Sequence, residues 1–391
     1  MNKKKSNKSR YKTIFIFFGL MLLSVSFSFA QKQKDLSQKV EFSIKSKILG
    51  ERRDISIYLP DKYDSASRIY PVIYVLDGRT HSPHTAEAVN FLSNFGIIPE
   101  MIVVSIHNVD RNRDFSPVYD ERYPTSGGAE KFLGFVSDEL MKYIDKKYRT
   151  SGFSILVGHS FGGTFATYSL LTKPEVFDAY IVISPYLHYD DNYLVNEAKN
   201  KLRSNYDKHK DFYMTVGNEK EYYQALEQFS LLINEKSNKF IDFEYVKMED
   251  ESHVTIPYIS VFNGLKFIFS DLDFQKENIK QGLGFIDGYY KQLSLKYGIE
   301  IRTPENLLNL LGYYYLKKND NKNAIKIFAE NVKRNPISSN VYDSLGEAYE
   351  RDNQLESAKI NYQKAYDFGS VYNNPNTSVY LKNLNRVIRK L

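Results

Sequence analysis

Short apolar runs recur along residues 39–270 and are separated by longer stretches of helical periodicity. Residues 40–44 and 55–59 alternate apolar and polar positions, which predicts two strands with one exposed face, as in an antiparallel hairpin at a sheet edge. The other runs are almost continuously apolar, which is typical of strands buried on both faces. They span residues 71–76, 101–106, 155–157, 179–185, 212–216 and 243–248.

Helices are predicted between and after these strands, and one of them is clearly amphipathic. The clearest spans residues 129–148, and further helices are expected over residues 84–94, 163–171, 194–206, 222–234 and 256–269. Strands that alternate with helices of this length predict an α/β fold with a mostly parallel sheet over residues 31–270. Residues 108–128 should form a long polar loop, and loops of this length are usually functional or mobile.

The chain changes character after residue 270, where helical patterns continue without further strands. Five residues recur in kind 34 positions later; the pairs are Leu311 and Leu345, Gly312 and Gly346, Tyr315 and Tyr349, Ala324 and Ala358, and Phe328 and Tyr362. This period, with small residues where helices would touch, is similar to that of a tetratricopeptide repeat. We therefore expect a small all-α repeat domain over residues 271–391, either covering the preceding domain or docking a protein partner.

The first 30 residues are organised like a secretory signal peptide. A basic stretch over residues 1–12 precedes an apolar core, and Ser28 and Ala30 supply the small residues of a cleavage site before Gln31. An uncleaved anchor is the alternative, but the apolar core of about 13 residues is short for a membrane span. We expect an exported protein, periplasmic or secreted, that meets the membrane only through this cleaved segment.

Charge and cysteine content narrow the function classes. The net charge of +6 comes from the leader, which carries six cations and no acid, so that 47 basic and 47 acidic residues remain beyond it. Such a neutral chain has no electrostatic footprint for nucleic acid. Cysteine is absent, which excludes a thiol nucleophile, a thiolate metal site, disulfides and a lipoprotein anchor.

A serine nucleophile is predicted at Ser160. The apolar run 155–157 leads into Gly158-His159-Ser160-Phe161-Gly162, and residues of helical character follow. This G-x-S-x-G sequence predicts a sharp strand-to-helix turn, in which any side chain at either glycine would collide with the neighbouring strand or helix. The backbone N–H of Phe161 would then stabilise an oxyanion. The alternative is a glycine-rich connection with a bystander serine.

His253 and Glu219 are the predicted partners of this serine. His253 follows the final strand at its carboxyl end, where open α/β sheets bind their ligands. Glu219 occupies the end of the penultimate strand, with Glu221 as its competitor and Asp190 or Asp191 as more remote alternatives. The order serine, acid, histidine is that of α/β hydrolases.

These residues predict nucleophilic catalysis on a carboxylic ester. His253 would accept the Ser160 proton as the hydroxyl attacks the carbonyl, and would then protonate the leaving alcohol, while Glu219 would hold the imidazole. The second oxyanion donor should come from the loop after residue 76, through the backbone N–H of Gly78 or Arg79. No metal and no cofactor are expected, because no residues show the spacing of metal ligands.

Four further residues are candidates for substrate contact. In the polar loop, Arg111 and Arg113 could hold a substrate carboxylate or pair with Asp110, Asp114 or Asp120, and we favour the pairing. His159 lies beside the nucleophile but on the wrong side to act as its base, and Tyr186 lies on a loop over the site.

Several segments together resemble the putative esterase family of α/β hydrolases, and within it the enterochelin (siderophore) esterase-like branch. They are residues 74–78 (YVLDG), 98–104 (IPEMIVV), 111–114 (RNRD), 158–163 (GHSFGG), 183–185 (ISP), 217–219 (GNE) and His253. The resemblance covers about residues 38–270 and implies serine ester hydrolysis with Ser160, Glu219 and His253 as the triad. It implies siderophore-type esters or acyl esters on carbohydrate as substrates.

The sequence thus predicts an exported serine esterase acting on a small-molecule or glycan ester, followed by a helical repeat domain. One rival is an inactive hydrolase-fold scaffold that binds a protein through its repeats, although the filled triad positions argue against it. The other is an acyltransferase, which shares the triad and differs in how well it excludes water.

Overall fold

The structure is a computed structural model that describes residues 38–61, 63–203, 205–237 and 239–391. The residues from Ser37 to Leu391 form one compact unit. The predicted signal peptide lies outside the described residues. Among the helices of the described ranges, none has both the length and the apolar character that crossing a membrane would require.

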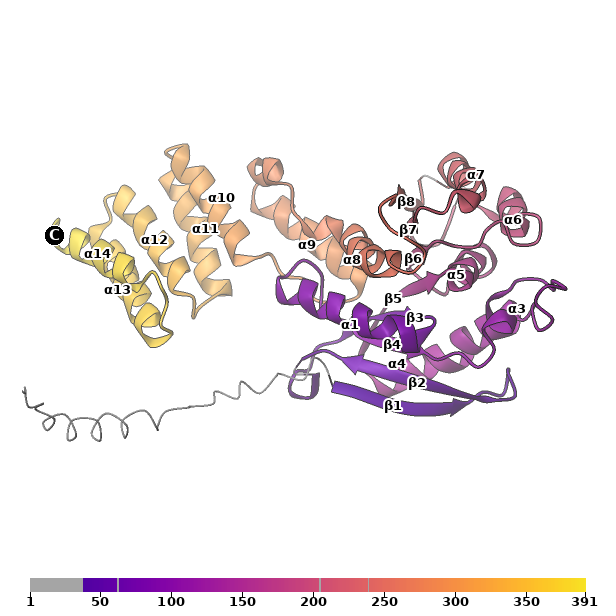
Figure 1. Cartoon of the computed structure of the whole chain (residues 1–391). Coiled ribbons are helices and arrows are strands. Elements are labelled where there is room, and N and C mark those ends of the chain that lie inside the picture. The colour runs from indigo at the N-terminus through magenta and orange to yellow at the C-terminus, as the bar shows by residue number, and fades with distance from the viewer. Residues whose placement is uncertain (1–37, 62, 204, 238) are drawn as a thin grey trace, which may run out of the picture. The chain divides into compact units, whose positions relative to one another are not determined.

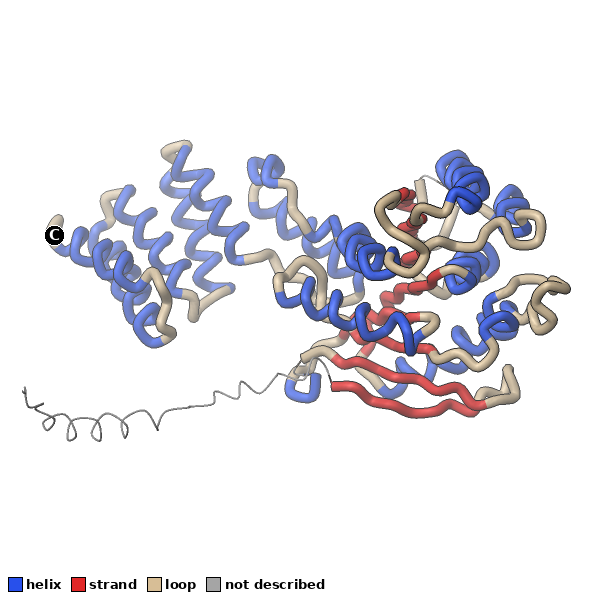
Figure 2. The backbone as a smooth tube through the Cα atoms, in the orientation of Figure 1, coloured by secondary structure: helices blue, strands red, loops and turns tan. Residues whose placement is uncertain are grey.

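Eight strands form one sheet in the order β1-β2-β4-β3-β5-β6-β7-β8. Figure 2 draws the strands in red and the helices in blue. Their bounds are Gln38–Lys45 (β1), Arg52–Leu59 (β2), Tyr70–Val75 (β3), Ile102–Ile106 (β4), Thr150–His159 (β5), Ala179–Ile183 (β6), Lys210–Val216 (β7) and Ile241–Lys247 (β8). β1 pairs antiparallel with β2 at the sheet edge, and β2 antiparallel with β4, whereas the pairs from β4 to β8 are parallel. The predicted α/β fold and edge hairpin are confirmed.

Helices alternate with the strands from β3 onward, and further helices follow the last strand (Figure 1). Those of the first part are Gly78–Asn94 (α1), Arg111–Phe115 (α2), Ala129–Gly134 (α3), Met141–Lys147 (α4), Phe161–Thr172 (α5), Tyr193–Lys201 (α6), Lys220–Lys236 (α7) and Ile256–Ile268 (α8). They are followed by Leu283–Tyr297 (α9), Glu305–Lys317 (α10), Asn321–Arg334 (α11), Ser339–Arg351 (α12), Leu355–Val371 (α13) and Thr377–Ile388 (α14).

The sheet separates two hydrophobic cores, because successive strand residues point to opposite faces. One core joins Tyr74 and Leu156 to side chains of α3 to α7. The other joins Val75 and Val157 to side chains of α1, α8 and α9. Each fully buried aliphatic side chain contributes about 1.5–3 kcal/mol to the free energy of folding. Packing on both faces of the sheet therefore fixes the strands that end at the predicted site.

Several predicted elements differ in kind or extent in the structure. The helix predicted over residues 129–148 is interrupted between α3 and α4 by a π-helical turn, Phe135–Leu140. The predicted polar loop contains the short helix α2, which begins where the Asp110 carboxylate accepts a hydrogen bond from the N–H of Arg113 (3.0 Å). The helix predicted from residue 84 begins instead at Gly78, because Asp77 turns the chain sharply with φ 49° and ψ 42°.

The C-terminal helices α10 to α14 pack in sequence, each against the next. A Cβ atom on Gly312 would lie 2.3 Å from a ring atom of Phe328, and one on Gly346 would lie 2.7 Å from a ring atom of Tyr362. The same glycine–ring contact thus recurs 34 residues later. Since α9 contributes Tyr297 to a core of the sheet, the helical segment is continuous with the α/β part. The predicted boundary after residue 270 stays a prediction.

Candidate functional site

Ser160 stands at the turn between β5 and α5. Its backbone has φ 59° and ψ −122°, a conformation that non-glycine residues rarely adopt, and its N–H donates to the carbonyl oxygen of Ile183 on β6 (2.9 Å). A Cβ atom on Gly158 would lie 2.1 Å from the carbonyl oxygen of Gly162. The turn therefore needs glycine at position 158, and it places a half-buried serine at the carboxyl edge of the sheet.

His253 and Glu219 meet at the same edge. His253 Nδ1 and Glu219 Oε1 lie 2.5 Å apart, so that a neutral imidazole held here donates from Nδ1 and leaves Nε2 as its acceptor. Glu219 directly precedes α7, whereas Glu221 lies in the exposed first turn of that helix. The structure therefore brings His253 together with the acid that the sequence favours over its neighbour.

The environment of Glu219 keeps this carboxylate charged. Burial opposes the charged form, but hydrogen bonds from His253 and from the Ser184 hydroxyl, with a further one from the N–H of Gly217, outweigh it and lower the pKa of Glu219 below its usual value. The Ser184 Oγ to Glu219 Oε2 distance is 2.5 Å, and the Gly217 N to Oε2 distance is 3.3 Å. Glu219 is thus a fixed negative charge against the histidine ring.

Two helix N-termini lie beside the serine. α5 begins at Phe161, and α1 begins at Gly78, after the two residues that follow β3, the strand that neighbours β5 in the sheet. The first N–H groups of a helix have no partner within the helix, so those of Phe161, Gly78 and Arg79 are available to an oxyanion. A Cβ atom on Gly78 would lie 2.3 Å from Ser105 Oγ, which explains the glycine.

Arg111 and Arg113 are held by protein acids. Arg111 Nε donates to Asp77 Oδ1 at 2.7 Å. Arg113 pairs with Glu51 at 2.7 Å and with Asp114 at 2.9 Å. Arg113 thus pairs with Asp114, one of the predicted acids, whereas Arg111 pairs with Asp77, which was not among them. Their part in substrate binding stays a prediction.

His159 packs against the predicted base. Its ring centroid lies 4.4 Å from that of His253 and 5.2 Å from that of His81, and His81 Nδ1 lies 3.1 Å from His84 Nε2. Burial, with His253 as a further cause, lowers the pKa of His159 to about 2. His159 is therefore neutral at physiological pH and presents an uncharged ring to His253.

Aromatic side chains border the serine on the side of α7. The ring of Phe161 lies 5.2 Å from that of Tyr186 and 5.1 Å from that of Tyr123. Tyr186 in turn lies 5.9 Å from Tyr222, whose ring is 6.0 Å from that of His253. Tyr186 thus lies in a continuous wall of rings that runs from the nucleophile turn to the histidine.

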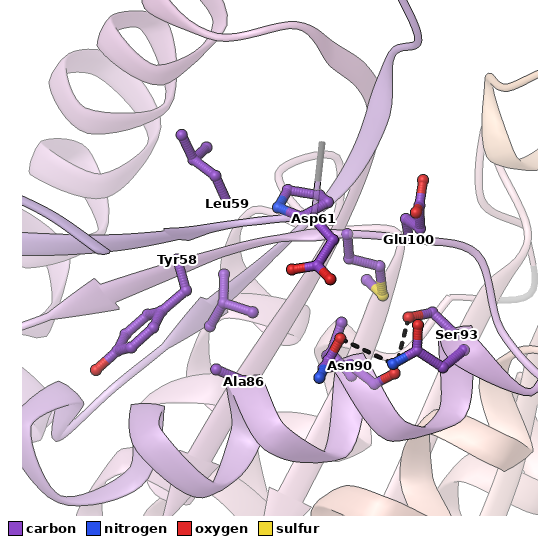
Figure 3. A pocket seen from close by; sticks show the side chains of 12 residues that line it. Tyr58, Leu59, Asp61, Ala86, Asn90, Ser93 and Glu100 are labelled. Atoms are coloured by element: carbon purple, nitrogen blue, oxygen red, sulfur yellow. Dashed lines mark hydrogen bonds between the residues drawn. The ribbon is translucent and has the colours of Figure 1, made fainter. Parts of the chain in front are cut away.

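Other hollows lie away from these residues. A pocket of about 30 Å³ at the amino end of β4 is lined by Tyr58, Asp61, Asn90 and Glu100, among others (Figure 3). This volume suits a water molecule and not an ester substrate. A larger hollow of about 940 Å³ lies between residues 67–70, 96–100 and 299–304 and does not include Ser160.

One group of possible metal ligands occurs in the described part of the chain. His209, Asp211 and Asp242 place their ligand atoms within 4.8 Å of one another. They lie at the amino ends of β7 and β8, away from the carboxyl edge that carries Ser160. The Lys296 ammonium already lies 3.4 Å from Asp211 and supplies a positive charge there.

Sequence reasoning missed two residues of this edge. Ser184, fully buried after β6, holds Glu219, and Asp77, the second residue after β3, holds Arg111. Both have positive φ, 40° for Ser184 and 49° for Asp77. A usable signal was their common position, since each is the polar residue that ends a buried parallel strand, the place where such sheets carry their sites.

Comparison with known proteins points to one family. A family model described as "Putative esterase" matches residues 46–254, more than half of the chain. The ferri-bacillibactin esterase BesA of Bacillus subtilis is 26% identical over 230 residues, which are 51% of this chain and 78% of that protein. A siderophore enterobactin esterase of Emericella nidulans is 32% identical over 112 residues, 25% of this chain and 37% of that protein.

Solved structures share the fold. An IroE-like serine hydrolase from Shewanella oneidensis matches with a TM-score of 0.62 and 27% identity, covering 72% of this chain and 95% of that one. An uncharacterised protein from Capnocytophaga ochracea matches with a TM-score of 0.69 and 19% identity, covering 90% of this chain and 100% of that one. Coverage of this extent means that the shared fold continues into the C-terminal helices.

Proposed function

Since the chain belongs to the putative esterase family, we propose that it is a serine hydrolase that cleaves carboxylic esters through an acyl-enzyme on Ser160. The observation that carries the proposal is the 2.5 Å contact between His253 Nδ1 and Glu219, at the edge where a strained turn presents Ser160. This contact leaves His253 Nε2 as an acceptor for a serine proton.

The proposed reaction follows from these positions. Ser160 Oγ attacks the ester carbonyl while His253 accepts its proton, and the charged Glu219 stabilises the imidazolium. The N–H groups of Phe161 and of Gly78 or Arg79 hold the oxyanion. His253 then protonates the leaving alcohol, and water repeats the cycle on the acyl-enzyme. A related serine hydrolase fold supports this proposal.

For the substrate we propose a siderophore-type ester, with an acyl ester on a glycan as the alternative. Two relatives are named for ferri-bacillibactin and enterobactin. The rings of Phe161, Tyr123, Tyr186 and Tyr222 form a continuous aromatic surface. This surface supports an ester with aromatic groups, because aromatic rings pack favourably against one another.

We also propose that the protein is exported and that residues 271–391 contain two tetratricopeptide-like repeats. The organisation of residues 1–30 supports the first proposal. The repeated contacts of Gly312 with Phe328 and of Gly346 with Tyr362 support the second. The repeats would cover one end of the hydrolase part or dock a protein partner.

The test is an ester panel assayed with the purified protein and its Ser160→Ala variant. The panel holds p-nitrophenyl acetate, a feruloyl sugar ester, an acetylated xylooligosaccharide and a ferric tri-catecholate lactone. We expect Ser160→Ala to lower kcat by about 10⁴-fold or more, whereas Ser137→Ala, on the π-helical turn, should leave it unchanged. The preferred member of the panel identifies the substrate class.

Each other outcome is informative. Activity that persists in Ser160→Ala would contradict the nucleophile assignment. If no ester of the panel is hydrolysed and a fluorophosphonate fails to label Ser160 in the folded protein, the inactive scaffold is favoured. Turnover that rises strongly when an alcohol acceptor is added would favour the acyltransferase.

A further inference from the structure

The two proposed oxyanion donors come from different parts of the chain. One is the N–H of Phe161 at the start of α5, and the other belongs to Gly78 or Arg79 at the start of α1. An oxyanion gains from both donors only when their spacing is fixed, because sites of this kind must be held to about 0.5 Å. Something must therefore hold the two helix starts together.

One guanidinium contacts both helix starts. Arg111 Nε donates to Asp77 Oδ1 at 2.7 Å, and Nη2 donates to Asp77 Oδ2 at 3.1 Å, which is a bidentate pair. The same Nη2 donates to the carbonyl oxygen of His159 at 3.1 Å. Asp77 immediately precedes α1 and His159 immediately precedes the nucleophile, so Arg111 links the two segments within two residues of each donor.

Arg111 is itself held in place. Its guanidinium lies over the rings of Phe115 and Phe161, at 5.5 Å and 5.7 Å from their centroids. α2, which carries it, is anchored by the buried pair of Arg53 and Asp114, in which both side chains are almost fully enclosed. A guanidinium held by two rings and by hydrogen bonds can transmit position, which a freely rotating side chain cannot.

Asp77 needs such a partner. It adopts a left-handed conformation, φ 49° and ψ 42°, that costs a non-glycine residue energy. Its carbonyl oxygen accepts hydrogen bonds from the N–H groups of Thr80 and His81, at 2.9 Å and 3.1 Å. The conformation of Asp77 thus sets the first turn of α1 and with it the direction of the N–H groups of Gly78 and Arg79.

We infer that Arg111, acting through Asp77 and the His159 carbonyl, is the positioning residue of the oxyanion hole. The inference rests on the proposed esterase function. It means that the Arg111 guanidinium binds groups of the protein and does not bind a substrate carboxylate. Arg111 touches no reacting atom, and its effect is on the spacing of the donors.

The test compares Arg111→Lys and Asp77→Asn with the unchanged protein on p-nitrophenyl acetate. Lysine keeps the charge but loses the bidentate fork, and asparagine keeps the shape and tolerates the left-handed backbone. We expect kcat to fall about 10- to 100-fold while KM stays within twofold, because a displacement of catalytic groups by about 1 Å can have an effect of this size. Binding of a boronate that mimics the tetrahedral intermediate should weaken by the same factor.

A matched control is Arg149→Lys, at the amino end of β5. Arg149 also donates to a backbone carbonyl, that of Arg68 at 3.0 Å, and lies over the ring of Tyr63. This variant loses a comparable arginine clamp outside the site. It should keep kcat and boronate affinity even if its thermal midpoint falls, which separates positioning from general stability.

Three outcomes would overturn the inference. One is a kcat within twofold of the unchanged protein in both Arg111→Lys and Asp77→Asn. Another is a rise of KM confined to anionic esters, which would make Arg111 a substrate ligand. If the unchanged protein has no esterase activity and binds no fluorophosphonate, the proposed function fails and the inference falls with it. If the unchanged protein is active and both variants are as active as it is, the inference fails while the proposed function stands.

Discussion

At the carboxyl edge of the sheet, glycine brings backbone against backbone, since a Cβ atom on Gly158 would lie 2.1 Å from the carbonyl oxygen of Gly162. In the C-terminal helices, glycine brings a helix against a ring, since a Cβ atom on Gly312 would lie 2.3 Å from Phe328. A ring can move on its side-chain torsions, whereas the Gly162 carbonyl cannot move without displacing the turn that carries Ser160. The first kind of contact therefore bears on the proposed chemistry as well as on stability, whereas the second bears on stability alone.

Carboxylates differ between the two regions in the same way. Glu219 accepts from a histidine and a serine hydroxyl at the sheet edge that carries the proposed nucleophile. Glu350, on α12, accepts from Arg386 at 2.8 Å and from the Tyr362 hydroxyl at 2.8 Å. Both are held by hydrogen bonds, but of the two only Glu219 has a histidine among the partners described. The predictions below test how far this separation holds.

The largest effect should follow Glu219→Gln. Losing the charge that stabilises the imidazolium should lower kcat by about 10³- to 10⁴-fold, while the fold is kept. Steady-state kinetics with p-nitrophenyl acetate measures the change. Glu221→Gln is the matched control, because this exposed neighbour makes no contact with His253 in the described structure. A larger loss in Glu221→Gln would reassign the acid.

Gly158→Ala should affect both activity and stability. The added methyl group meets a backbone carbonyl and forces the turn to move, so we expect the free energy of unfolding to fall by about 3 kcal/mol or more. Ester turnover should be lost in the fraction that still folds. Urea unfolding followed by circular dichroism, with an ester assay on the same sample, measures both. Unchanged turnover would contradict the separation drawn above.

Gly312→Ala should lower stability but leave turnover intact. Overpacking against Phe328 should cost about 1–3 kcal/mol in the free energy of unfolding. Gly288→Ala on α9 is the matched control, since its added Cβ atom meets no atom within 4 Å and should stabilise the helix by up to about 1 kcal/mol. Lost turnover in folded Gly312→Ala would show that the helices control the site.

The smallest effect is expected from pH. Hydrogen bonds from Arg386 are the main cause that lowers the pKa of Glu350 to about 2, against a usual value of 4.5. A carboxyl group with a lowered folded-state pKa adds stability that is complete above its unfolded value and is lost as pH falls. We expect the unfolding midpoint to drop between pH 4.5 and 2, and Glu350→Gln to reduce that slope. An unchanged slope would remove Glu350 as its cause.

Sequence patterns pointed to the candidate site residues that are close together in the chain or that follow the ends of strands. The glycines around Ser160 and the polar residues that end β7 and β8 are visible in the chain because strand, turn and helix follow one another. The preference for Glu219 over Glu221 agrees with the contact to His253 in the structure. The 34-residue spacing of Gly312 and Gly346 also marks a contact that recurs in space.

Other features depend on partners far apart in the chain. The pair of Arg111 with Asp77 spans 34 residues, and neither residue type indicates the other. The start of α1 was predicted too late, because the αL conformation of Asp77 is set by tertiary contacts and the helix has no side-chain cap. The place of α9 in a core of the sheet depends on Tyr297, whose hydroxyl donates to the carbonyl oxygen of Ile268 (2.9 Å).

Three strands end in residues with positive φ that are not glycine: Asp77 after β3, Ser160 after β5 and Ser184 after β6. A screen that selects only for heat resistance would favour glycine at each, because glycine relieves the conformational strain. Each such gain would remove a side chain on which the proposed site depends. Engineers who seek a hardier form of this protein should therefore exclude these three positions from their libraries and search the C-terminal helices first.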